Sequence, residues 1–537
     1  MEKNNMIKVP LEKLRFADPN RRTGDQKFDT KPMSYAKDVF RRFCKNKSSV
    51  VAAIIIILLV LFAIFVPIFC ETNYSLALTD TTYLKYTNLL PKNKMFEGTG
   101  FWDGTKKDTI NDNRYNMLMA LSEETGYDVI TETYGEPYNG SGVSANVIYH
   151  DVRLDTYLLS GMEYVDLSRE QFEDIQRWQN ETGIQVIYPA VDVKLTDPKS
   201  KQPLINKIQH GNANVWYATD AKGNPRFDKT TGELIPSYAD KNAKRFSGLL
   251  YTEQYYKYDS LRIEGDEGNY LYAQMSHVTV NGEIIPSYKV RVLLKNYFHY
   301  RYGHEASFLF GTNQNGQDIL TRLAAGARFS LILAVCISAI NLFIGAMYGA
   351  IEGFYGGTVD IVMERISDIL GGMPSMVVMS LFQLHLASKV GPVWSMVFAF
   401  ILTGWLGMAA RTRMQFYRFK HQEYVLSAKT LGASDRRLIF KHIFPNAMGT
   451  LITGSVLSIP GVIFSESSLT YLGIVNLSSS TQTSVGTLLS KGNSVLSSYP
   501  HIILFPALFI SLLEISFNLF GNGLRDAFNP SLKGIED

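Results

Sequence analysis

An uncharged stretch of 23 residues, from Ser48 to Cys70, limits more than any other feature what this chain can fold into. A helix of about 20 apolar residues is long enough to cross a hydrocarbon core of about 30 Å. A cleaved signal peptide is the alternative interpretation, but such a peptide occupies about the first 30 residues of a chain. Here 47 residues precede the stretch. The stretch therefore predicts a membrane-spanning helix.

The charges on either side of this stretch predict its orientation. The flank immediately before it is basic, with Arg41, Arg42, Lys45 and Lys47. The segment that follows it begins with Glu71. Because positively charged flanks remain in the cytoplasm, we expect a cytoplasmic N-terminus and a chain that emerges outside after Cys70.

Residues 71–305 differ in composition from the rest of the chain. They contain no apolar run long enough to span a membrane and are rich in Tyr, Asn, Asp, Lys and Gly. The three cysteines, Cys44, Cys70 and Cys336, lie elsewhere. Without a disulfide framework, a soluble domain is held together by an ordinary packed core. We expect a mixed α/β domain of about 230 residues, within the usual range of domain sizes.

Local signals within this segment predict several elements. Ser168 followed by Gln171 forms a capping box, and Gly183 ends the helix that follows. Three apolar residues of that helix share one face: Phe172, Ile175 and Trp178. We expect a strand at 184–191 after the helix.

A second group of signals lies near the end of the segment. Asn281-Gly282 separates 277–280 from 283–285 and predicts a hairpin turn of two residues. Residues 288–294 predict another strand.

Apolar stretches return after residue 320, at 328–351, 362–386, 392–410, 446–472 and 500–522. Each is long enough to cross a membrane, so the sequence predicts six spans in all. Alternation from an outside start places the loop 411–446 in the cytoplasm. That loop is basic, as the positive-inside rule expects. Its basic residues are Arg411, Arg413, Arg418, Lys420, Lys429, Arg436, Arg437 and Lys441.

Within the basic loop, residues 423–437 (EYVLSAKTLGASDRR) form a helix-favouring stretch with small residues at its end, and 442–446 (HIFPN) follows. This segment resembles the coupling motif of ABC importer permeases, a short cytoplasmic helix that docks into a groove on an ATPase subunit. Residues 310–328 (FGTNQNGQDILTRLAAGAR) and 517–530 (FNLFGNGLRDAFNP) resemble the C-type subunit of oligopeptide, dipeptide and nickel importers. The basic segment 41–47 fits the same subunit. Together the similarity covers residues 33–70 and 305–535.

The resemblance implies an α-helical membrane protein with six transmembrane helices, a type I ABC importer permease (MetI-like) fold and a mixed α/β soluble domain inserted between helices 1 and 2. The expected parts are a cytoplasmic tail and elbow helix (1–47), transmembrane helix 1 (48–70), an extracytoplasmic domain (71–305), a permease core (306–525) with its coupling loop (411–446), and a cytoplasmic C-terminal tail (526–537).

The resemblance also implies partners. These are a homologous second permease, two cytoplasmic ATPases that use ATP and Mg, and an extracytoplasmic peptide-binding protein. The chain itself has no Gly-x-x-x-x-Gly-Lys-Ser/Thr loop, so we expect it to bind no cofactor and to hydrolyse no ATP. It also lacks a His-Glu-x-x-His motif or a Gly-x-Ser-x-Gly elbow, and we expect no catalytic residue and no metal. The net charge of +3 gives no indication of nucleic-acid binding.

The residues expected to contact the ATPase are Glu423, Ala428, Gly432, Ala433, Ser434 and Pro445. Small side chains such as Ala428 and Gly432 allow close contact with a partner, but Gly432 is equally suited to be a helix C-cap. Charged groups inside a span are costly and face a protein interface or water. Glu466 is therefore a candidate for the pathway or for a structural contact, and Glu514 is a candidate for the pathway or for a bond to the paired permease. On the third span, Arg365 is available to pair with Asp360, Glu364 and Asp368.

Two alternatives to a peptide importer remain open from sequence. A nickel or other small-solute importer would have the same fold, because a separate binding protein selects the substrate. A membrane-anchored receptor or sensor belongs to a different class of protein, and six spans with a coupling motif argue against it.

Overall fold

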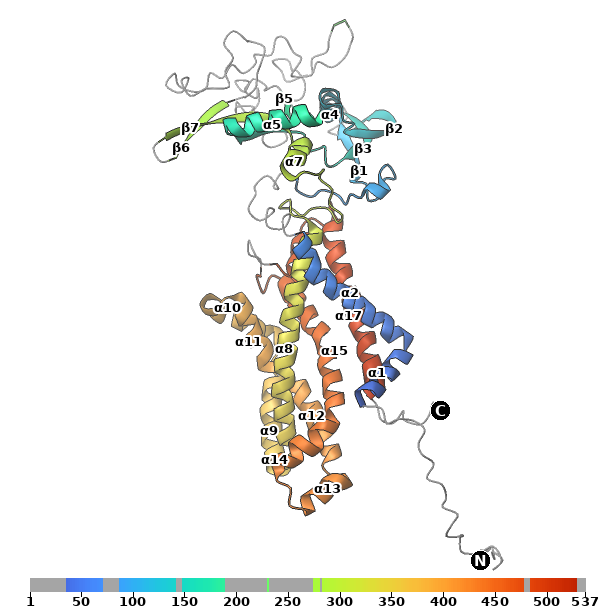
Figure 1. The fold of residues 1–537 in the computed structure, drawn as a ribbon, viewed down its shortest axis with the longest axis vertical. Coiled ribbons are helices and arrows are strands. Elements are labelled where there is room, and N and C mark those ends of the chain that lie inside the picture. The colour runs from blue at the N-terminus through green and yellow to red at the C-terminus, as the bar shows by residue number, and fades with distance from the viewer. Residues whose placement is uncertain are drawn as a thin grey trace, which may run out of the picture.

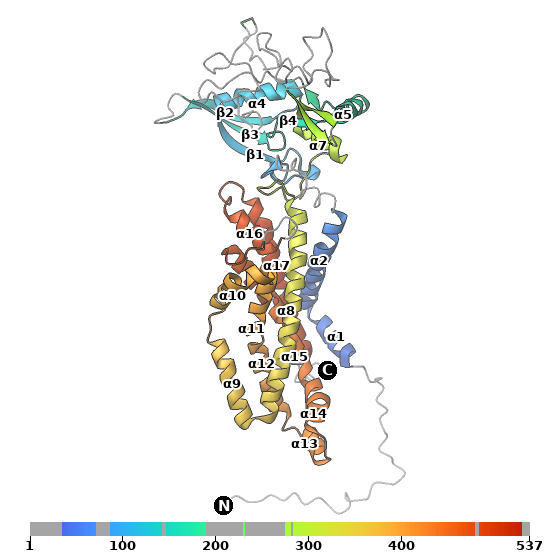
Figure 2. The same ribbon diagram turned by 90° about the vertical axis from the view of Figure 1, so that its left-hand side faces the viewer.

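A computed structural model describes residues 35–70, 86–141, 147–188, 229–230, 274–280, 283–477 and 483–528. The chain forms a long bundle of helices with a β-containing part at one end (Figures 1 and 2). We call this part the β unit, and it comprises the described residues between 86 and 302. The predicted N-terminal tail, the hairpin residues Asn281-Gly282 and the tail after Phe528 lie outside the described residues.

Five helical segments in the described chain are long and apolar enough to cross a membrane. They are α2 (Lys47–Phe69), α8 (Ile319–Tyr355), α11 with α12 (Pro392–Phe419), α14 through α15 (Asp435–Tyr471) and α17 (His501–Phe528). The pair α9 (Gly357–Gly371) and α10 (Ser375–Val390) makes a sixth if it counts as one span. The structure thus has an apolar helix at each predicted span.

The third span is not the continuous helix that the sequence led us to expect at 362–386. α9 and α10 meet at an angle of 72°, and Figure 1 shows α10 projecting to the side of the bundle. Residues 372–374 separate the two helices. Pro374 explains the break, because proline has no N–H to donate and disfavours a helical conformation in the residue before it.

Close packing of α8 against α12 (Leu406–Phe419) holds the centre of the bundle together. Gly345, Gly349 and Gly353 follow one another at every fourth position of α8. A Cβ on Gly345 would lie 2.6 Å from the Trp405 carbonyl oxygen, and one on Gly349 would collide with the Ala409 carbonyl. Small residues at this spacing allow two membrane helices to approach backbone to backbone.

α1 (Tyr35–Lys45) is the predicted elbow helix. It ends one residue before α2, and the Asn46 side chain between them accepts a hydrogen bond from the Ser49 N–H. Phe43 of α1 stacks edge-to-face on Phe520 of α17, with ring centroids 5.3 Å apart. The start of the first span is therefore packed against the end of the last one.

The β unit contains two antiparallel sheets. The first has the order β1-β3-β2, from Thr105–Asn111, Ile148–Asp155 and Ile130–Asn139. The second has the order β4-β7-β5, and β6 also pairs with β7. Its strands are β4 (Met162–Leu167), β5 (Ile187–Tyr188), β6 (Gln274–Val280) and β7 (Glu283–Leu293).

Helices cover these sheets with apolar side chains. α4 (Asp112–Thr125) contributes Leu118 and Leu121 to a core with Val152 and Leu154 of β3. α5 (Arg169–Thr182) packs Phe172 and Ile175 against Tyr288, Val290 and Val292 of β7. α7 (Leu294–Tyr302) follows β7 directly, and the short helix η3 spans Lys94–Phe96.

The local predictions for this segment are largely confirmed. The capping box between Ser168 and Gln171 is present, and Gly183 ends α5 with a φ of +74°. β6 and β7 pair in the register expected of the hairpin, from Val280 opposite Glu283 outward. Of the predicted strand at 184–191, Ile187–Tyr188 form β5, 184–186 are not in a strand, and 189–191 lie outside the described residues.

One expectation was wrong, because 283–285 and 288–294 are not separate strands. They form the single strand β7, which runs through Pro286. β4 pairs with β7 only from Tyr288 onward, so β6 is the one described strand beside Pro286. A proline is tolerated at such an edge position.

Two chain segments join the β unit to the bundle. The Lys92 N–H donates to the Phe308 carbonyl at 2.9 Å, and the Asn88 N–H donates to the Asn313 carbonyl at 3.0 Å. At the same level, Phe310 stacks on Phe505 of α17 with ring centroids 4.0 Å apart. The segments that enter and leave the β unit are therefore paired beside the N-terminal end of α17.

Candidate functional site

The segment that resembles a coupling motif forms the tip of the bundle opposite the β unit (Figures 1 and 2). It contains α13 (Glu423–Thr430), α14 (Asp435–Arg437) and the π-helix η7 (Leu438–Ile443), which continues into α15 (Phe444–Tyr471). We call residues 423–443 the tip. The predicted helix is therefore interrupted between Thr430 and Asp435.

Gly432 explains this interruption. It has a φ of +81°, a conformation that favours glycine. Its N–H donates to the Lys429 carbonyl and the Ala433 N–H donates to the Ala428 carbonyl, both at 3.0 Å. These two bonds define a Schellman motif, so the helix C-cap role considered for Gly432 is confirmed.

The predicted coupling residues divide into two groups in the structure. Glu423, Gly432, Ser434 and Pro445 are exposed. Ala428 and Ala433 are partly buried against the chain's own apolar cluster, which includes Val425 and Leu438. Their small side chains therefore let α13 pack on η7, and their contact with an ATPase stays a prediction.

The tip also presents large apolar side chains that sequence reasoning missed. Tyr424, Leu426, Leu431 and Phe440 are exposed, and Leu431 is 87% exposed. The Tyr424 hydroxyl accepts a hydrogen bond from Asn446 at 3.1 Å. The sequence did contain a signal for this surface, because these apolar residues interrupt a basic loop that is too polar to cross a membrane. Exposed apolar groups gathered at one place indicate an interaction surface.

Next to the tip, Arg413 of α12 holds three carboxylates from two other helices. Its guanidinium donates two hydrogen bonds to Asp360, at 2.6 and 2.8 Å, and lies 3.2 Å from Glu364. Glu352 of α8, which is 2% exposed, lies 3.5 Å away. The Tyr417 hydroxyl donates to Asp360 at 2.7 Å. These interactions tie α8, α9 and α12 together.

The predicted pairing of Arg365 with the acidic residues of the third span is correct for one of them and wrong for the other two. Arg365 pairs with Asp368 at 2.9 Å, as considered from the sequence. Asp360 and Glu364 pair instead with Arg413, 53 and 49 residues further along the chain. Helical spacing identified the acidic face of α9, but it carries no information about which distant helix supplies the cation.

Oxygen atoms of Glu352, Asp360 and Glu364 lie within 4.8 Å of one another, a spacing that a metal ion could bridge. The Arg413 guanidinium contacts all three carboxylates and supplies positive charge there. Lys420 lies nearby and donates to the Gly353 carbonyl at 3.0 Å. The group is thus explained as an ion-pair network.

Glu466 of α15 is buried, with 1% of its surface exposed. Its carboxylate accepts hydrogen bonds from the hydroxyls of Ser330 at 2.9 Å, Thr470 at 3.3 Å and Ser467 at 3.4 Å. Ser330 belongs to α8, so Glu466 links the fifth span to the second. Of the two roles considered for Glu466, this geometry favours a structural contact.

Glu514 of α17 is partly buried between the buried Leu513 and the exposed Ile515. The structure gives it no hydrogen bond or ion pair with the residues that it describes. Its role in a pathway therefore stays a prediction.

Comparison with known proteins supports the resemblance stated from the motifs. Residues 341–534 match the family described as binding-protein-dependent transport system inner membrane component. Residues 34–91 match the N-terminal TM domain of oligopeptide transport permease C. Most of the β unit lies outside both matches.

Individual relatives are also named as permeases of peptide transport systems. The oligopeptide transport system permease protein OppC of Bacillus subtilis is 42% identical over 224 residues, which cover 42% of this chain and 72% of the relative. The dipeptide transport system permease protein DppC of the same organism is 38% identical over 229 residues, 42% of this chain and 70% of the relative. A chain of the MetNI methionine ABC transporter is 10% identical, with a TM-score of 0.30 over 38% of this chain and 96% of that one, a score too low to support an argument about the fold.

Replacing Arg413 tests whether the network stabilises the bundle. Arg413→Leu leaves three carboxylates without their cation, and breaking a fully buried pair costs about 3–5 kcal/mol. The cost here is smaller because Arg413 is 28% exposed. We expect the unfolding temperature of the detergent-purified chain to fall by several degrees. Arg365→Leu is the control, since its exposed pair with Asp368 contributes about 0–1 kcal/mol. Equal unfolding temperatures in the two variants would contradict the structural role of Arg413.

A pair of substitutions tests the structural role of Glu466. Glu466→Ala removes the acceptor for Ser330, so we expect membrane abundance and peptide uptake to fall by the same factor. Glu466→Gln keeps an oxygen acceptor and should restore much of both. Abundance is measured by quantitative immunoblotting and uptake with a labelled peptide. Loss of uptake at normal abundance would instead assign the carboxylate to the pathway.

Proposed function

This chain belongs to the family of C-type permeases of oligopeptide and dipeptide ABC importers, and we propose that it forms one half of an oligopeptide pathway and couples to ATPases through its tip. It is a multi-pass membrane protein and a permease subunit rather than an enzyme. ATP hydrolysis is carried out by separate ATPase subunits. Beyond family membership, we propose which residues contact the ATPase, how the chain is oriented in the membrane and which partners it binds.

The exposed apolar side chains of the tip carry the proposal for coupling. Leu431, Leu426 and Phe440 are exposed, although other apolar residues of the tip, including Val425, Leu438 and Ile443, pack in a buried core. The Schellman motif at Gly432 fixes the turn that presents Leu431. Because exposed apolar surface is stabilised by contact with a partner, we propose that an ATPase subunit covers these residues. A second ATPase would bind the homologous permease.

The arrangement along the bundle supports the proposed orientation. The β unit and the tip lie at opposite ends of the spans (Figure 2). The basic residues before α2 predict a cytoplasmic start, so the β unit follows on the outer side and the tip on the inner side. We propose that both termini are cytoplasmic, and that residues 71–305 form an extracytoplasmic domain that helps to receive a peptide-binding protein.

Substitution of Leu431 tests the coupling contact. Leu431→Glu places a charge on the most exposed apolar residue of the tip, so we expect the ATPase subunits to co-purify at least tenfold less. Leu496→Glu, at an exposed leucine near the outer end of the bundle, is the matched control and should co-purify normally. ATPase bound equally by both variants would contradict the proposed surface. Leu431 is preferable to Gly432, where any side chain is strained by the positive φ.

Removal of the β unit tests its role as a platform. Residues 95–305 can be replaced by a short glycine linker, because Lys92 and Phe308 are already hydrogen-bonded to each other. We expect normal insertion and ATPase binding, but uptake at least tenfold lower at limiting concentrations of the binding protein. Uptake is measured in proteoliposomes, with the binding protein on the side of the membrane that carries the β unit. Uptake at the full rate would refute the platform.

A further inference from the structure

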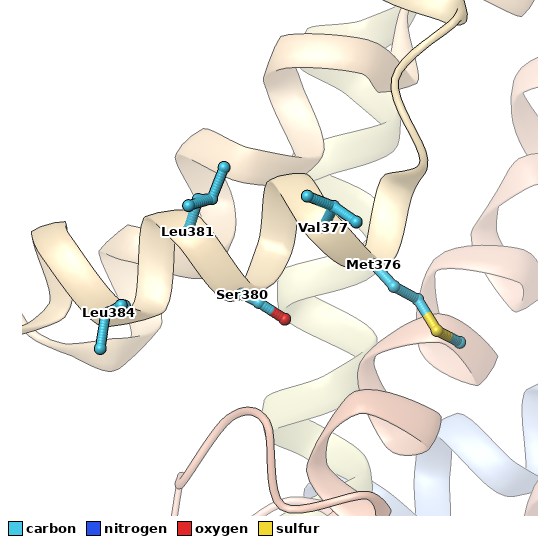
Figure 3. Close-up of a pocket in the computed structure, with 5 residues that line it drawn as sticks. All are labelled: Met376, Val377, Ser380, Leu381 and Leu384. Atoms are coloured by element: carbon cyan, nitrogen blue, oxygen red, sulfur yellow. The ribbon is translucent and has the colours of Figure 1, made fainter.

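Two hollows meet on the side of the bundle from which α10 projects. One is a cavity of about 510 Å³ between α10, α15, α16 (Val485–Asn493) and α17. Its lining residues are Met376, Phe464, Ser467, Ser468, Tyr471, Leu472, Leu489, Ala507, Ile510 and Ser511. The other is a groove of about 280 Å³ along α10, lined by Met376, Val377, Ser380, Leu381 and Leu384 (Figure 3). Met376 belongs to both, so the two hollows form one continuous surface.

The bend in the third span accounts for this surface. Because α10 leaves the bundle at 72° to α9, it does not close over α15 and α17. Figure 3 shows the five groove residues along α10, with Met376 at one end of the row and Leu384 at the other. The side chains of Met376, Phe464 and Leu472 are consequently exposed.

The surface is neutral. Among the described residues that line the two hollows, none carries a charge at neutral pH. Glu466 is the neighbour of Ser467 in the chain, but its carboxylate bonds to Ser330, Thr470 and Ser467 and is buried. The carboxylate closest in sequence to the lining residues is therefore buried and hydrogen-bonded within the bundle.

Three hydroxyl groups on this surface differ from several others in the spans, although the buried Ser516 hydroxyl of α17 is also without a partner in the described part of the chain. The hydroxyls of Thr412, Thr453 and Ser395 donate to backbone carbonyls within the chain. Those of Ser468, Tyr471 and Ser511 have no hydrogen-bond partner among the residues that the structure describes, and all three line the cavity. Free hydroxyls on an otherwise apolar wall match a ligand that offers both N–H and C=O groups.

We propose that this surface is the part of the translocation pathway that binds the peptide main chain, through the hydroxyls of Ser468, Tyr471 and Ser511. The inference rests on the proposed function and deepens it. The volume of the cavity lies within the range of about 300–1,000 Å³ that is usual for small-ligand sites. The apolar wall accommodates aliphatic side chains, and its neutrality leaves it without preference for acidic or basic ones.

A charge introduced at Ser468 tests this assignment. The complete transporter, with its second permease, ATPases and binding protein, is reconstituted in proteoliposomes. ATP-dependent uptake is then measured for the tripeptides Ala-Ala-Ala, Ala-Lys-Ala and Ala-Glu-Ala at saturating concentration. In Ser468→Asp we expect uptake of Ala-Glu-Ala to fall about tenfold relative to Ala-Lys-Ala, because the new carboxylate repels one peptide and attracts the other. Ser468→Asn is the control, because asparagine has nearly the same size as aspartate but no charge. It should keep the wild-type ratio of Ala-Glu-Ala to Ala-Lys-Ala uptake.

Ser511→Asp provides an independent position on α17, a different helix of the cavity, and should shift the ratio in the same direction. This variant carries the test if Ser468→Asp fails to assemble. A ratio that stays unchanged in both Asp variants would overturn the inference, because lipid or the second permease would then cover the surface. That outcome leaves the proposed function intact. Failure of the wild-type transporter to take up any of the three peptides would instead overturn the proposed function.

Discussion

The contact between α8 and α12 is the constraint on which the remaining structure of the bundle depends. Helices in a membrane gain little from burying apolar surface, because lipid is as apolar as their side chains. They associate instead through close packing, and the glycines at 345, 349 and 353 bring the two backbones together. A Cβ on Gly353 would lie 2.7 Å from the Arg413 carbonyl oxygen. The last glycine of the row thus fixes the backbone at the residue that carries the ion-pair network.

The network extends this contact to the broken third span. α9 follows α8 after a single residue, and its Asp360 and Glu364 reach Arg413 on α12. The tip begins four residues after the end of α12. A displacement of the tip by an ATPase would therefore be carried by α12 and its salt bridges to α8 and α9 together. Motion of such packed elements as rigid bodies is a recurring form of conformational switching.

The sequence predicted the elements whose signals are local. Three such features depend only on neighbouring residues: the span at 48–70, the capping box at Ser168 and the hairpin around Asn281. The span and the capping box appear as expected, and so do the two strands of the hairpin. The break at Pro374 also had a local signal, but the apolar run across it was long enough to hide it. What the sequence could not give is pairing over distance. Arg365 is the cation nearest to Asp360 in sequence, but Asp360 pairs with Arg413 in the structure. Only the packing of α8 against α12 brings Arg413 to Asp360.

The same distinction applies to the candidate site. Small residues at 428 and 433 indicated close contact, but a sequence does not state on which side of a short helix that contact occurs. Their packing on η7 shows that the chain uses them internally, which leaves the bulky Leu431 and Leu426 outside. Polar residues in the spans separate in the same way. Glu466 is satisfied by hydroxyl partners, whereas Ser468 and Ser511 line the cavity without a partner among the described residues. A membrane protein that must move a polar solute needs both kinds of polar group, because unsatisfied polar groups in lipid are costly. The three unpartnered hydroxyls that line the cavity, Ser468, Tyr471 and Ser511, are therefore better evidence for a pathway than the buried carboxyl of Glu466.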